Sequence, residues 1–204
     1  MTERLILASN SPRRREILSS IGLRFDAVGP DVEELRIPGE TPGQMARRLA
    51  GDKALCVSNG NPGRVVLGAD TVVDLDGEVF GKPSDRDDAL RMLRALNGRT
   101  HMVHTGVALA LSGEILESGV ETTRVVFGDL PDDEINRFAA LGLGDDKAGA
   151  YAIQGRGALM VERIEGCYYN VVGLPVFRLK RMLGRHMPDL LSRGGESDYG
   201  ESVR

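Results

Sequence analysis

Three adjacent arginines stand at a point of the sequence where like charges need a physical reason. Arg13 to Arg15 follow Ser11-Pro12, a few residues after a short apolar run. One interpretation is a solvated first helical turn that improves solubility. The other is an anion site, because backbone amides at the start of a helix, together with guanidinium groups, suit phosphate oxygens.

Lys53 interrupts an apolar pattern. In a helix over residues 42–58 it falls in the middle of a face formed by Met45, Ala46, Leu49, Ala50, Cys56 and Val57. The lysine either extends its amine along the apolar surface to water or directs it inward at an anion, and its central position favours the second interpretation. On that interpretation, Lys53→Met should lose turnover with stability unchanged or improved, because it removes a charge from an apolar face.

Asp70 interrupts the β-branched run VVLGADTVVDL. A carboxylate inside a strand is costly to bury unless it meets a cation, a metal or hydrogen-bond donors. Gly68 and Ala69 leave space for another group to approach the backbone. The alternative is that Asp70 ends a strand and accepts local backbone N–H groups, but the strand pattern resumes at Thr71.

Two polar side chains lie on loops. Lys82 in FGKPSD comes one hairpin turn after the Asp70 strand, which favours proximity to Asp70, although a loop lysine can be merely solvated. Gln154 is the amide of DKAGAYAIQGRG, a segment that matches neither the P-loop nor the dinucleotide fingerprint. Cations suited to phosphate beside a lone carboxylate indicate a divalent metal. The residues alone therefore predict a metal-assisted enzyme acting on a phosphorylated small molecule.

A mixture of strands and helices must position these residues. Pro12 and Pro42 each take the first helical position after a capping serine or threonine, Ser84 caps a third helix, and Asp76-Gly77 marks a hairpin turn. The pattern predicts helices at 12–21, 42–58, 85–96, 131–141 and 174–185, and strands at 5–8, 25–28, 65–75, 78–80, 101–111, 115–127, 158–164 and 168–172. Strict alternation is absent, which predicts a mixed-sheet α/β or α+β fold.

Size and composition limit the class of protein. The 204 residues are 41% hydrophobic and 27% charged, which suits a single domain over residues 1–187, while Gly, Ser and charges predict a disordered tail over 188–204. The net charge of −4 argues against a general nucleic-acid binder. No apolar stretch has membrane-spanning length, and the 2 cysteines fit neither a metal site nor a disulfide framework, so we expect a soluble cytoplasmic protein.

Five fragments in series resemble the Maf family of nucleoside triphosphate pyrophosphatases, also known as septum formation inhibitors. They are LASNSPRRREIL, GADTVV, GKP, DKAGAYAIQG and VVGLP, and they occur in this order between Leu7 and Pro175. The resemblance implies the fold of inosine triphosphate pyrophosphatase, an elongated mixed β-sheet flanked by helices, with two lobes around a central cleft. It also implies hydrolysis of a nucleoside triphosphate to the monophosphate and pyrophosphate with Mg²⁺ or Mn²⁺.

The resemblance also implies roles for individual residues. The positions that match substrate-binding residues of the family are Ser9, Arg13, Arg14, Lys53 and Lys82. Asp70 matches the catalytic carboxylate, which acts as a general base or as a ligand of the metal. Glu34 in DVEEL matches its acidic partner in holding metal or water, although the adjacent Glu33 is an alternative.

Through the same resemblance, three residues imply which base the nucleotide substrate carries. The branch of the family that has Arg13, Thr71 and Gln154 at these positions is associated with dTTP and UTP and with a house-cleaning role. The branch that hydrolyses 7-methyl-GTP tends instead to show SDQ and a glutamate in the glycine-rich loop. Alternatives are 7-methyl-GTP or another non-standard nucleotide as substrate, or a nucleotide-responsive regulator of septum formation. The expected partner is a nucleoside triphosphate rather than nucleic acid or membrane, and a homodimer is left open.

Overall fold

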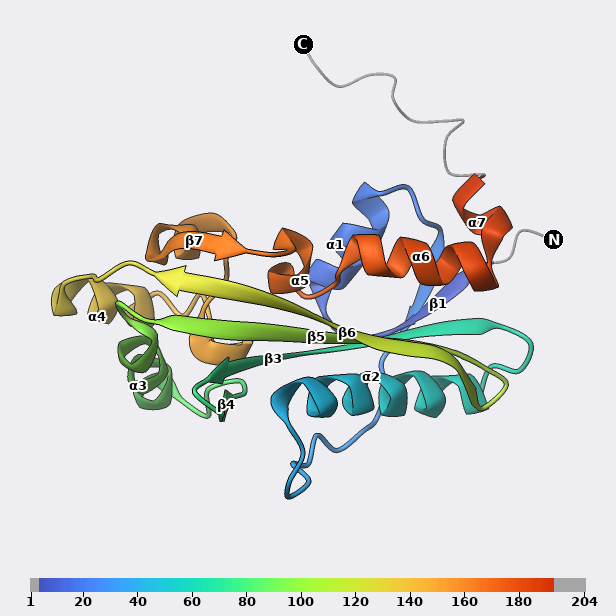
Figure 1. Ribbon diagram of the computed structural model, residues 1–204, viewed down its shortest axis with the longest axis horizontal. Coiled ribbons are helices and arrows are strands. Elements are labelled where there is room, and N and C mark those ends of the chain that lie inside the picture. The colour runs from blue at the N-terminus through green and yellow to red at the C-terminus, as the bar shows by residue number, and fades with distance from the viewer. Residues whose placement is uncertain (1–3, 193–204) are drawn as a thin grey trace, which may run out of the picture.

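A seven-stranded mixed β-sheet runs along the molecule (Figure 1). The computed structural model describes residues 4–192. The strands are β1 (Leu5–Ala8), β2 (Phe25–Val28), β3 (Val65–Leu75), β4 (Glu78–Phe80), β5 (Thr100–Leu111), β6 (Glu114–Phe127) and β7 (Val161–Glu165). Their order is β2-β1-β3-β5-β6-β7, and β4 pairs with the end of β3. β1 is parallel to β2 and β3, whereas the other pairs are antiparallel.

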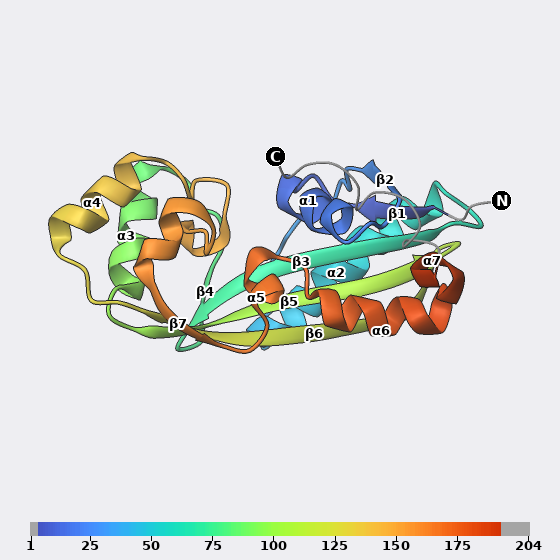
Figure 2. The same ribbon diagram turned by 90° about the horizontal axis from the view of Figure 1, so that it is seen from above.

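Helices cover both faces of this sheet. They are α1 (Pro12–Ser20), α2 (Pro42–Asn59), α3 (Arg86–Leu96), α4 (Asp132–Ala140), α5 (Tyr168–Val172), α6 (Val176–His186) and α7 (Pro188–Ser192), with 3₁₀ helices η1 (Ala148–Ala150) and η2 (Gly155–Met160). Helix α2 lies along one face, and α1, α5 and α6 lie on the other (Figure 1). Helices α3 and α4 lie at the opposite end of the long strands from α1 and α6 (Figure 2). The predicted mixed α/β fold with an elongated, helix-flanked sheet is confirmed.

Two glycines allow α2 to pack closely on the sheet. A Cβ at Gly68 on β3 would lie 2.1 Å from the carbonyl oxygen of Ala50 on α2. A Cβ at Gly106 on β5 would lie 2.1 Å from the carbonyl oxygen of Ala46 on the same helix. The group that approaches the backbone beside Asp70 is therefore helix α2, and this close approach decides which α2 side chains reach the centre of β3.

The apolar core is divided along the sheet. One part packs α1 and α6 against the sheet around Leu67 and Leu109, both fully buried. A second part packs α3 and α4 around Phe80 and Phe127, and two smaller parts pack α2 against the sheet. On β3, Asp70 follows Ala69 of the first part and precedes Val73 of the second. The parts of the core therefore meet near the centre of β3, where Asp70 lies.

Residues 168–172 form helix α5, so the strand predicted there is wrong. Their aromatic and β-branched composition favours a strand. However, Asn170 is fully buried, and its Nδ2 donates to the carbonyl oxygen of Val103 at 2.9 Å and to Thr123 Oγ1 at 3.0 Å. Gly173 follows the helix with a φ of 121°, a conformation that favours glycine. Tertiary hydrogen bonds thus override the local propensity.

Several element boundaries also differ from the predicted ones, most of them by one or two residues. The first residues of the strand expected over 158–164 belong to η2, and β7 begins at Val161. Helix α3 begins at Arg86, and its cap is Asp85 rather than Ser84. The Asp85 carboxylate accepts a backbone N–H of the first turn at 2.8 Å, and aspartate is among the preferred capping residues.

The segment expected to be a disordered tail begins with a helix. Residues 188–192 form α7, and Leu190 and Leu191 pack against the core beside α6. These two leucines give the segment an apolar surface to bury, so its first turn is ordered. Residues 193–204, which carry the remainder of that prediction, lie outside the described residues.

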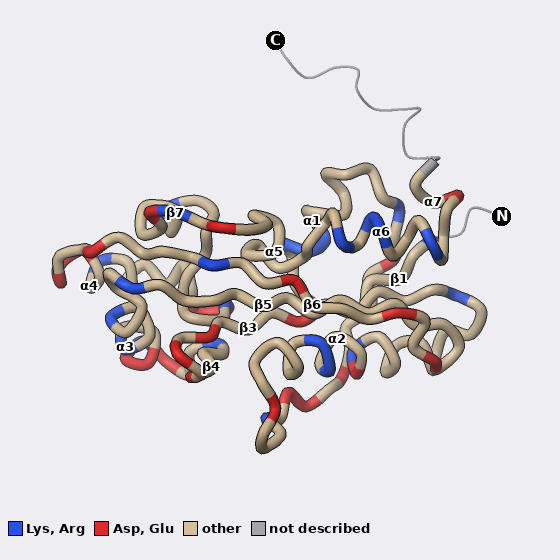
Figure 3. Tube along the Cα trace, viewed as in Figure 1, with Lys and Arg blue, Asp and Glu red and all other residues tan. Residues whose placement is uncertain are grey.

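Both signs of charge occur along the described chain. Lys and Arg are interspersed with Asp and Glu from one end of the molecule to the other (Figure 3). Within residues 4–192, none of the helices has the length and apolarity needed to cross a bilayer. Neither end of the described chain is dominated by one sign of charge (Figure 3). The charged residues of interest are therefore those that meet at the centre of the sheet.

Candidate active site

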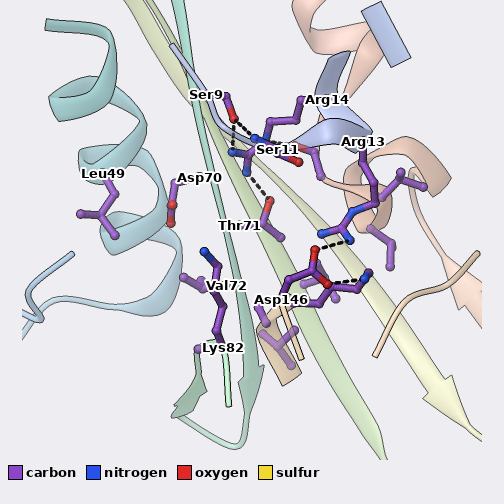
Figure 4. A pocket seen from close by; sticks show the side chains of 18 of the residues that line it. Ser9, Ser11, Arg13, Arg14, Leu49, Asp70, Thr71, Val72, Lys82 and Asp146 are labelled. Carbon is purple, nitrogen blue, oxygen red and sulfur yellow. Dashed lines mark hydrogen bonds and ion pairs between the residues drawn. The ribbon is translucent and has the colours of Figure 1, made fainter. Parts of the chain in front are cut away.

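A cleft of about 420 Å³ lies beside the middle of β3 (Figure 4). The residues that the sequence assigned to the site all line it, namely Ser9, Arg13, Arg14, Glu34, Lys53, Asp70, Thr71, Lys82 and Gln154. Of the two adjacent glutamates, Glu34 lines the cleft and Glu33 does not. The fold thus brings together residues from widely separated parts of the chain.

Lys53 bridges two carboxylates. Its Nζ donates to Asp70 Oδ1 at 2.5 Å and to Glu34 Oε1 at 2.6 Å. The Lys53 and Asp70 side chains are only 10% and 7% exposed, whereas that of Glu34 is 50% exposed. The amine therefore points inward to an anion rather than out to water. Asp70 does not end its strand, because β3 continues to Leu75.

The environment shifts the pKa values of the two carboxylates in opposite directions. Burial raises the pKa of Asp70, and the charges of Lys53 and Arg14 only partly oppose this effect. Partial burial acts to raise the pKa of Glu34 as well, but its hydrogen bond and charge contact with Lys53 lower it on balance. Asp70 is thus the better proton acceptor at neutral pH, because an effective general base has a pKa near the working pH.

Arg14 is a buried guanidinium whose three nitrogens each have a partner. Nε donates to the carbonyl oxygen of Gly173 at 2.9 Å, Nη1 to Ser9 Oγ at 3.2 Å and Nη2 to Thr71 Oγ1 at 3.1 Å. Burial lowers the pKa of Arg14, yet arginine stays protonated in proteins. Arg14 therefore fixes the positions of two cleft hydroxyls and adds a permanent positive charge behind them.

The start of α1 differs in detail from the expected cap. Ser11 occupies the capping position and Pro12 the first turn, as predicted, but the Ser11 side chain makes no capping hydrogen bond. Instead, Ser9 Oγ accepts the backbone N–H of Ser11 at 3.2 Å. This bond holds Ser9 at the junction between β1 and α1, beside the first turn of the helix.

Sequence reasoning missed Asp146. Its carboxylate lies 3.8 Å from Nη1 of Arg13 and 2.5 Å from Nζ of Lys147, and Arg13 and Asp146 lie across the cleft from Asp70 (Figure 4). The sequence shows only an acidic pair, Asp145-Asp146, before DKAG, so no local signal distinguishes the residue that faces Arg13. Arg13 is therefore held near the cleft by a carboxylate from a distant loop.

Lys82 and Gln154 are available polar groups of the cleft. Both are exposed and line it, and within residues 4–192 neither side chain has a hydrogen-bond or ion-pair partner. Lys82 is close enough to Glu34 for its charge to lower the pKa of that carboxyl. Both side chains can therefore turn toward a ligand without first breaking a bond.

The carboxylates can hold a hard cation only together with a ligand. Asp70 and Glu34 converge on one point, where Lys53 Nζ meets both. Mg²⁺ is commonly bound by one or two carboxylates plus substrate phosphates. Among the described residues, no group of three or more His, Cys, Asp or Glu side chains is arranged to hold a metal. The donor set thus fits a cation that arrives with phosphate oxygens.

Comparisons with known proteins identify the family to which the chain is similar. The model of the family described as Maf-like protein matches residues 4–186. A Geobacter metallireducens protein named dTTP/UTP pyrophosphatase is 51% identical over 176 residues, covering 85% of this chain and 91% of its own. A Geobacter sulfurreducens protein of the same name is 50% identical over 185 residues, covering 89% and 96%. Among solved structures, a HAM1 protein from Coxiella burnetii matches 64% of this chain and 75% of its own at 17% identity, with a TM-score of 0.46.

Proposed function

Because the chain belongs to the Maf-like protein family, we propose that it hydrolyses dTTP and UTP to the monophosphate and pyrophosphate. The observation that carries the proposal is the buried Asp70, held by Lys53 in a cleft that also collects Arg13, Arg14 and Lys82. Relatives of about half identical sequence bear the name dTTP/UTP pyrophosphatase. A cavity of about 420 Å³ also falls in the range of about 300–1,000 Å³ typical of small-molecule sites.

Asp70 is the group suited to activate water. The hydrogen bond from Lys53 fixes one carboxylate oxygen and leaves the other to accept a proton from a water placed for attack on the α-phosphorus. The raised pKa of Asp70 brings its basicity closer to what proton transfer near neutral pH requires. Asp70 thus both orients the water and takes its proton.

The cations of the cleft bind the phosphates. Lys82 and Arg13 can turn to the β- and γ-phosphates, while Lys53 and the fixed charge of Arg14 lie nearer Asp70. As pyrophosphate leaves, negative charge grows on its bridging oxygen, and preorganised positive groups stabilise this charge without reorganising. Arg13 must leave Asp146 to take part, so the triphosphate replaces that carboxylate as its partner.

A divalent cation belongs to the proposal. When bound, Mg²⁺ or Mn²⁺ would neutralise phosphate charge and polarise the reacting phosphoryl group. Asp70 and Glu34 are the residues that would hold it, and Glu34 is accessible enough to move toward an incoming cation. Lys53 would then share the two carboxylates with the cation.

Base selectivity is proposed to come from Gln154, Thr71 and Arg13. The Gln154 amide offers a donor and an acceptor, which matches the carbonyl and N–H edge shared by uracil and thymine. These bases differ by one methyl group, and a single methylene or methyl is worth only about 1–3 kcal/mol in an apolar pocket. One site can therefore accept both UTP and dTTP.

The test is pyrophosphate release from a panel of triphosphates. Purified protein should act on UTP and dTTP more efficiently than on ATP, GTP, ITP and 7-methyl-GTP, in assays with Mg²⁺ or Mn²⁺ and in controls with chelator. Asp70→Asn prepared in parallel should be inactive, which excludes a contaminating phosphatase. A preference for 7-methyl-GTP would contradict the pyrimidine assignment, and equal activity of Asp70→Asn would contradict the enzyme itself.

A further inference from the structure

Two threonine hydroxyls form a hydrogen-bonded chain behind the wall of the cleft. Thr71 on β3 pairs in register with Thr105 on β5, and their Oγ1 atoms lie 3.0 Å apart. Thr105 is fully buried, and its Oγ1 donates to the backbone carbonyl oxygen of Asn170 at 2.8 Å. On the other side, Nη2 of Arg14 lies 3.1 Å from Thr71 Oγ1. The cleft-lining hydroxyl of Thr71 is thus held by fixed groups on two sides.

The number of protons gives each bond in this chain a direction. A threonine hydroxyl has one proton and two lone pairs, a carbonyl oxygen only accepts, and a guanidinium only donates. The Asn170 carbonyl must therefore take the proton of Thr105. Thr71 must then donate its own proton to Thr105, while one of its lone pairs accepts from Arg14. What Thr71 retains for a ligand is one lone pair and no proton.

Ser9 on the same cleft has the opposite polarity. Its Oγ accepts the backbone N–H of Ser11 and Nη1 of Arg14, each at 3.2 Å. Both lone pairs are used, so Ser9 can offer a ligand only its proton, which suits a phosphate oxygen. Arg14 therefore leaves a donor at Ser9 and an acceptor at Thr71.

An acceptor of fixed polarity can distinguish the pyrimidines. Uracil and thymine carry an N–H at N3, whereas cytosine carries a lone pair there. Gln154 cannot enforce this difference alone, because its amide is both donor and acceptor, and within residues 4–192 no partner fixes its orientation. The Thr71 hydroxyl, in contrast, cannot turn a proton toward the base while Thr105 holds that proton.

We propose that Thr105 is a positioning residue that keeps Thr71 an acceptor for the N3–H of the base, so that the cleft selects uracil and thymine over cytosine. The inference rests on the proposed function, because it places a pyrimidine nucleotide in the cleft. Thr105 itself touches no substrate and acts only through the orientation of the Thr71 hydroxyl.

The experiment compares the binding of uridine and cytidine analogues. Dissociation constants for α,β-imido UTP and α,β-imido CTP are measured by calorimetry, because binding can be followed whether or not hydrolysis occurs. Wild-type protein should bind the uridine analogue at least about tenfold more tightly, since cytosine leaves polar groups unpaired. Thr105→Val should reduce this ratio at least about fivefold, mainly by tighter binding of the cytidine analogue, because the freed Thr71 proton can turn to its N3.

Two control variants separate this role from general stability. Thr105→Ser keeps the hydroxyl and should keep the wild-type ratio. Thr123→Val removes another buried threonine hydroxyl, which bonds to Asn170 and to the carbonyl oxygen of Cys167 at 3.0 Å each, but it does not contact Thr71 and should also keep the ratio. A ratio that is unchanged in Thr105→Val, or that changes as much in Thr123→Val, overturns the proposal.

A second variant keeps the proposal testable if Thr105→Val does not fold. Thr71→Val removes the acceptor at the cleft and should bring the ratio of the two dissociation constants close to one. An unchanged ratio in Thr71→Val overturns the proposal. The proposal is also overturned if Thr71→Val changes only the relative binding of UTP and 3′-deoxy-UTP, because that result would place Thr71 at the sugar. Absence of pyrophosphate release from UTP would instead refute the proposed function. The ratio of the dissociation constants for the two analogues would still test the role of Thr105.

Discussion

Replacing Lys53 by methionine separates the ion pair from the packing around it. The Lys53 ammonium lies 2.5 Å from Asp70 Oδ1, and the lysine side chain is 10% exposed. Methionine retains an unbranched apolar stem but has no charge, so Lys53→Met leaves the Asp70 carboxylate, 7% exposed, without its cation. The sequence pattern predicts stability unchanged or improved for this variant, because it shows only a charge on an apolar face. The ion pair reverses that expectation.

The expected loss can be estimated from the burial of the pair. Removing one partner of a buried ion pair costs about 3–5 kcal/mol. For a chain of this size, 1 kcal/mol shifts Tm by about 2–4 °C, so Lys53→Met should melt roughly 6–20 °C below wild type at pH 7.

The loss should depend on pH. Without Lys53, the pKa of Asp70 rises further above its ordinary value of 3.8. A carboxyl whose folded pKa is raised contributes stability below its unfolded pKa and loses it as the pH rises through the folded value. The deficit in Tm should therefore shrink as the pH falls from 7 toward 4.

Calorimetric scans between pH 4 and pH 8 on Lys53→Met, Asp70→Asn and the double variant test this reasoning. The double variant should recover most of the stability lost in Lys53→Met, because the unpaired carboxylate is gone and the two sites are coupled. Turnover should be lost in all three proteins. A Lys53→Met protein that melts like wild type at pH 7, with no dependence of the difference on pH, would refute the buried ion pair.

Three further predictions follow from the same contacts. Asp70→Asn should stay folded and release pyrophosphate at least roughly 100-fold more slowly, and near-normal turnover in a folded variant would remove Asp70 from the chemistry. Gly68→Ala should lower the free energy of unfolding, measured with denaturant, by about 1–3 kcal/mol or more, because its Cβ would lie 2.1 Å from the Ala50 carbonyl oxygen. Gly128→Ala is the control and should cost little, because the space around Gly128 is open. Burial lowers the pKa of His101 from 6.5 to about 4, so the free energy of unfolding should fall by about 3 kcal/mol between pH 6.5 and pH 4. In His101→Leu this part of the pH dependence should be absent, and a variant that keeps all of it would contradict the prediction.

The elements that carry Lys53 and Asp70 could be predicted because their signals are local. Thr41 and Gln44 form a capping box at the start of α2, and the apolar face of that helix shows that Lys53 points toward the sheet. Asp70 likewise interrupts a continuous β-branched run, and that run predicts the strand β3 around it. Contact between the two then needs only that α2 packs on β3, which Gly68 permits.

Other parts of the site depend on tertiary contacts that the sequence pattern does not contain. Glu34 lies outside any helix or strand, so no periodicity places it, and its contact with Lys53 follows only from the resemblance to a family. Asp146 and Thr105 gave no sequence signal, because one resembles any acidic turn residue and the other any strand threonine. The strand predicted over 168–172 is wrong for the same reason, since Asn170 of helix α5 is held by hydrogen bonds to distant strands.

The most direct measurement of the central claim is hydrolysis of UTP in water enriched in ¹⁸O. Attack on the α-phosphorus by a water that Asp70 activates predicts that the label enters UMP, that the pyrophosphate is unlabelled, and that neither UDP nor orthophosphate forms. Mass spectrometry of the two products decides where the label is. Label in pyrophosphate, or release of orthophosphate with UDP, would contradict the assignment of this cleft.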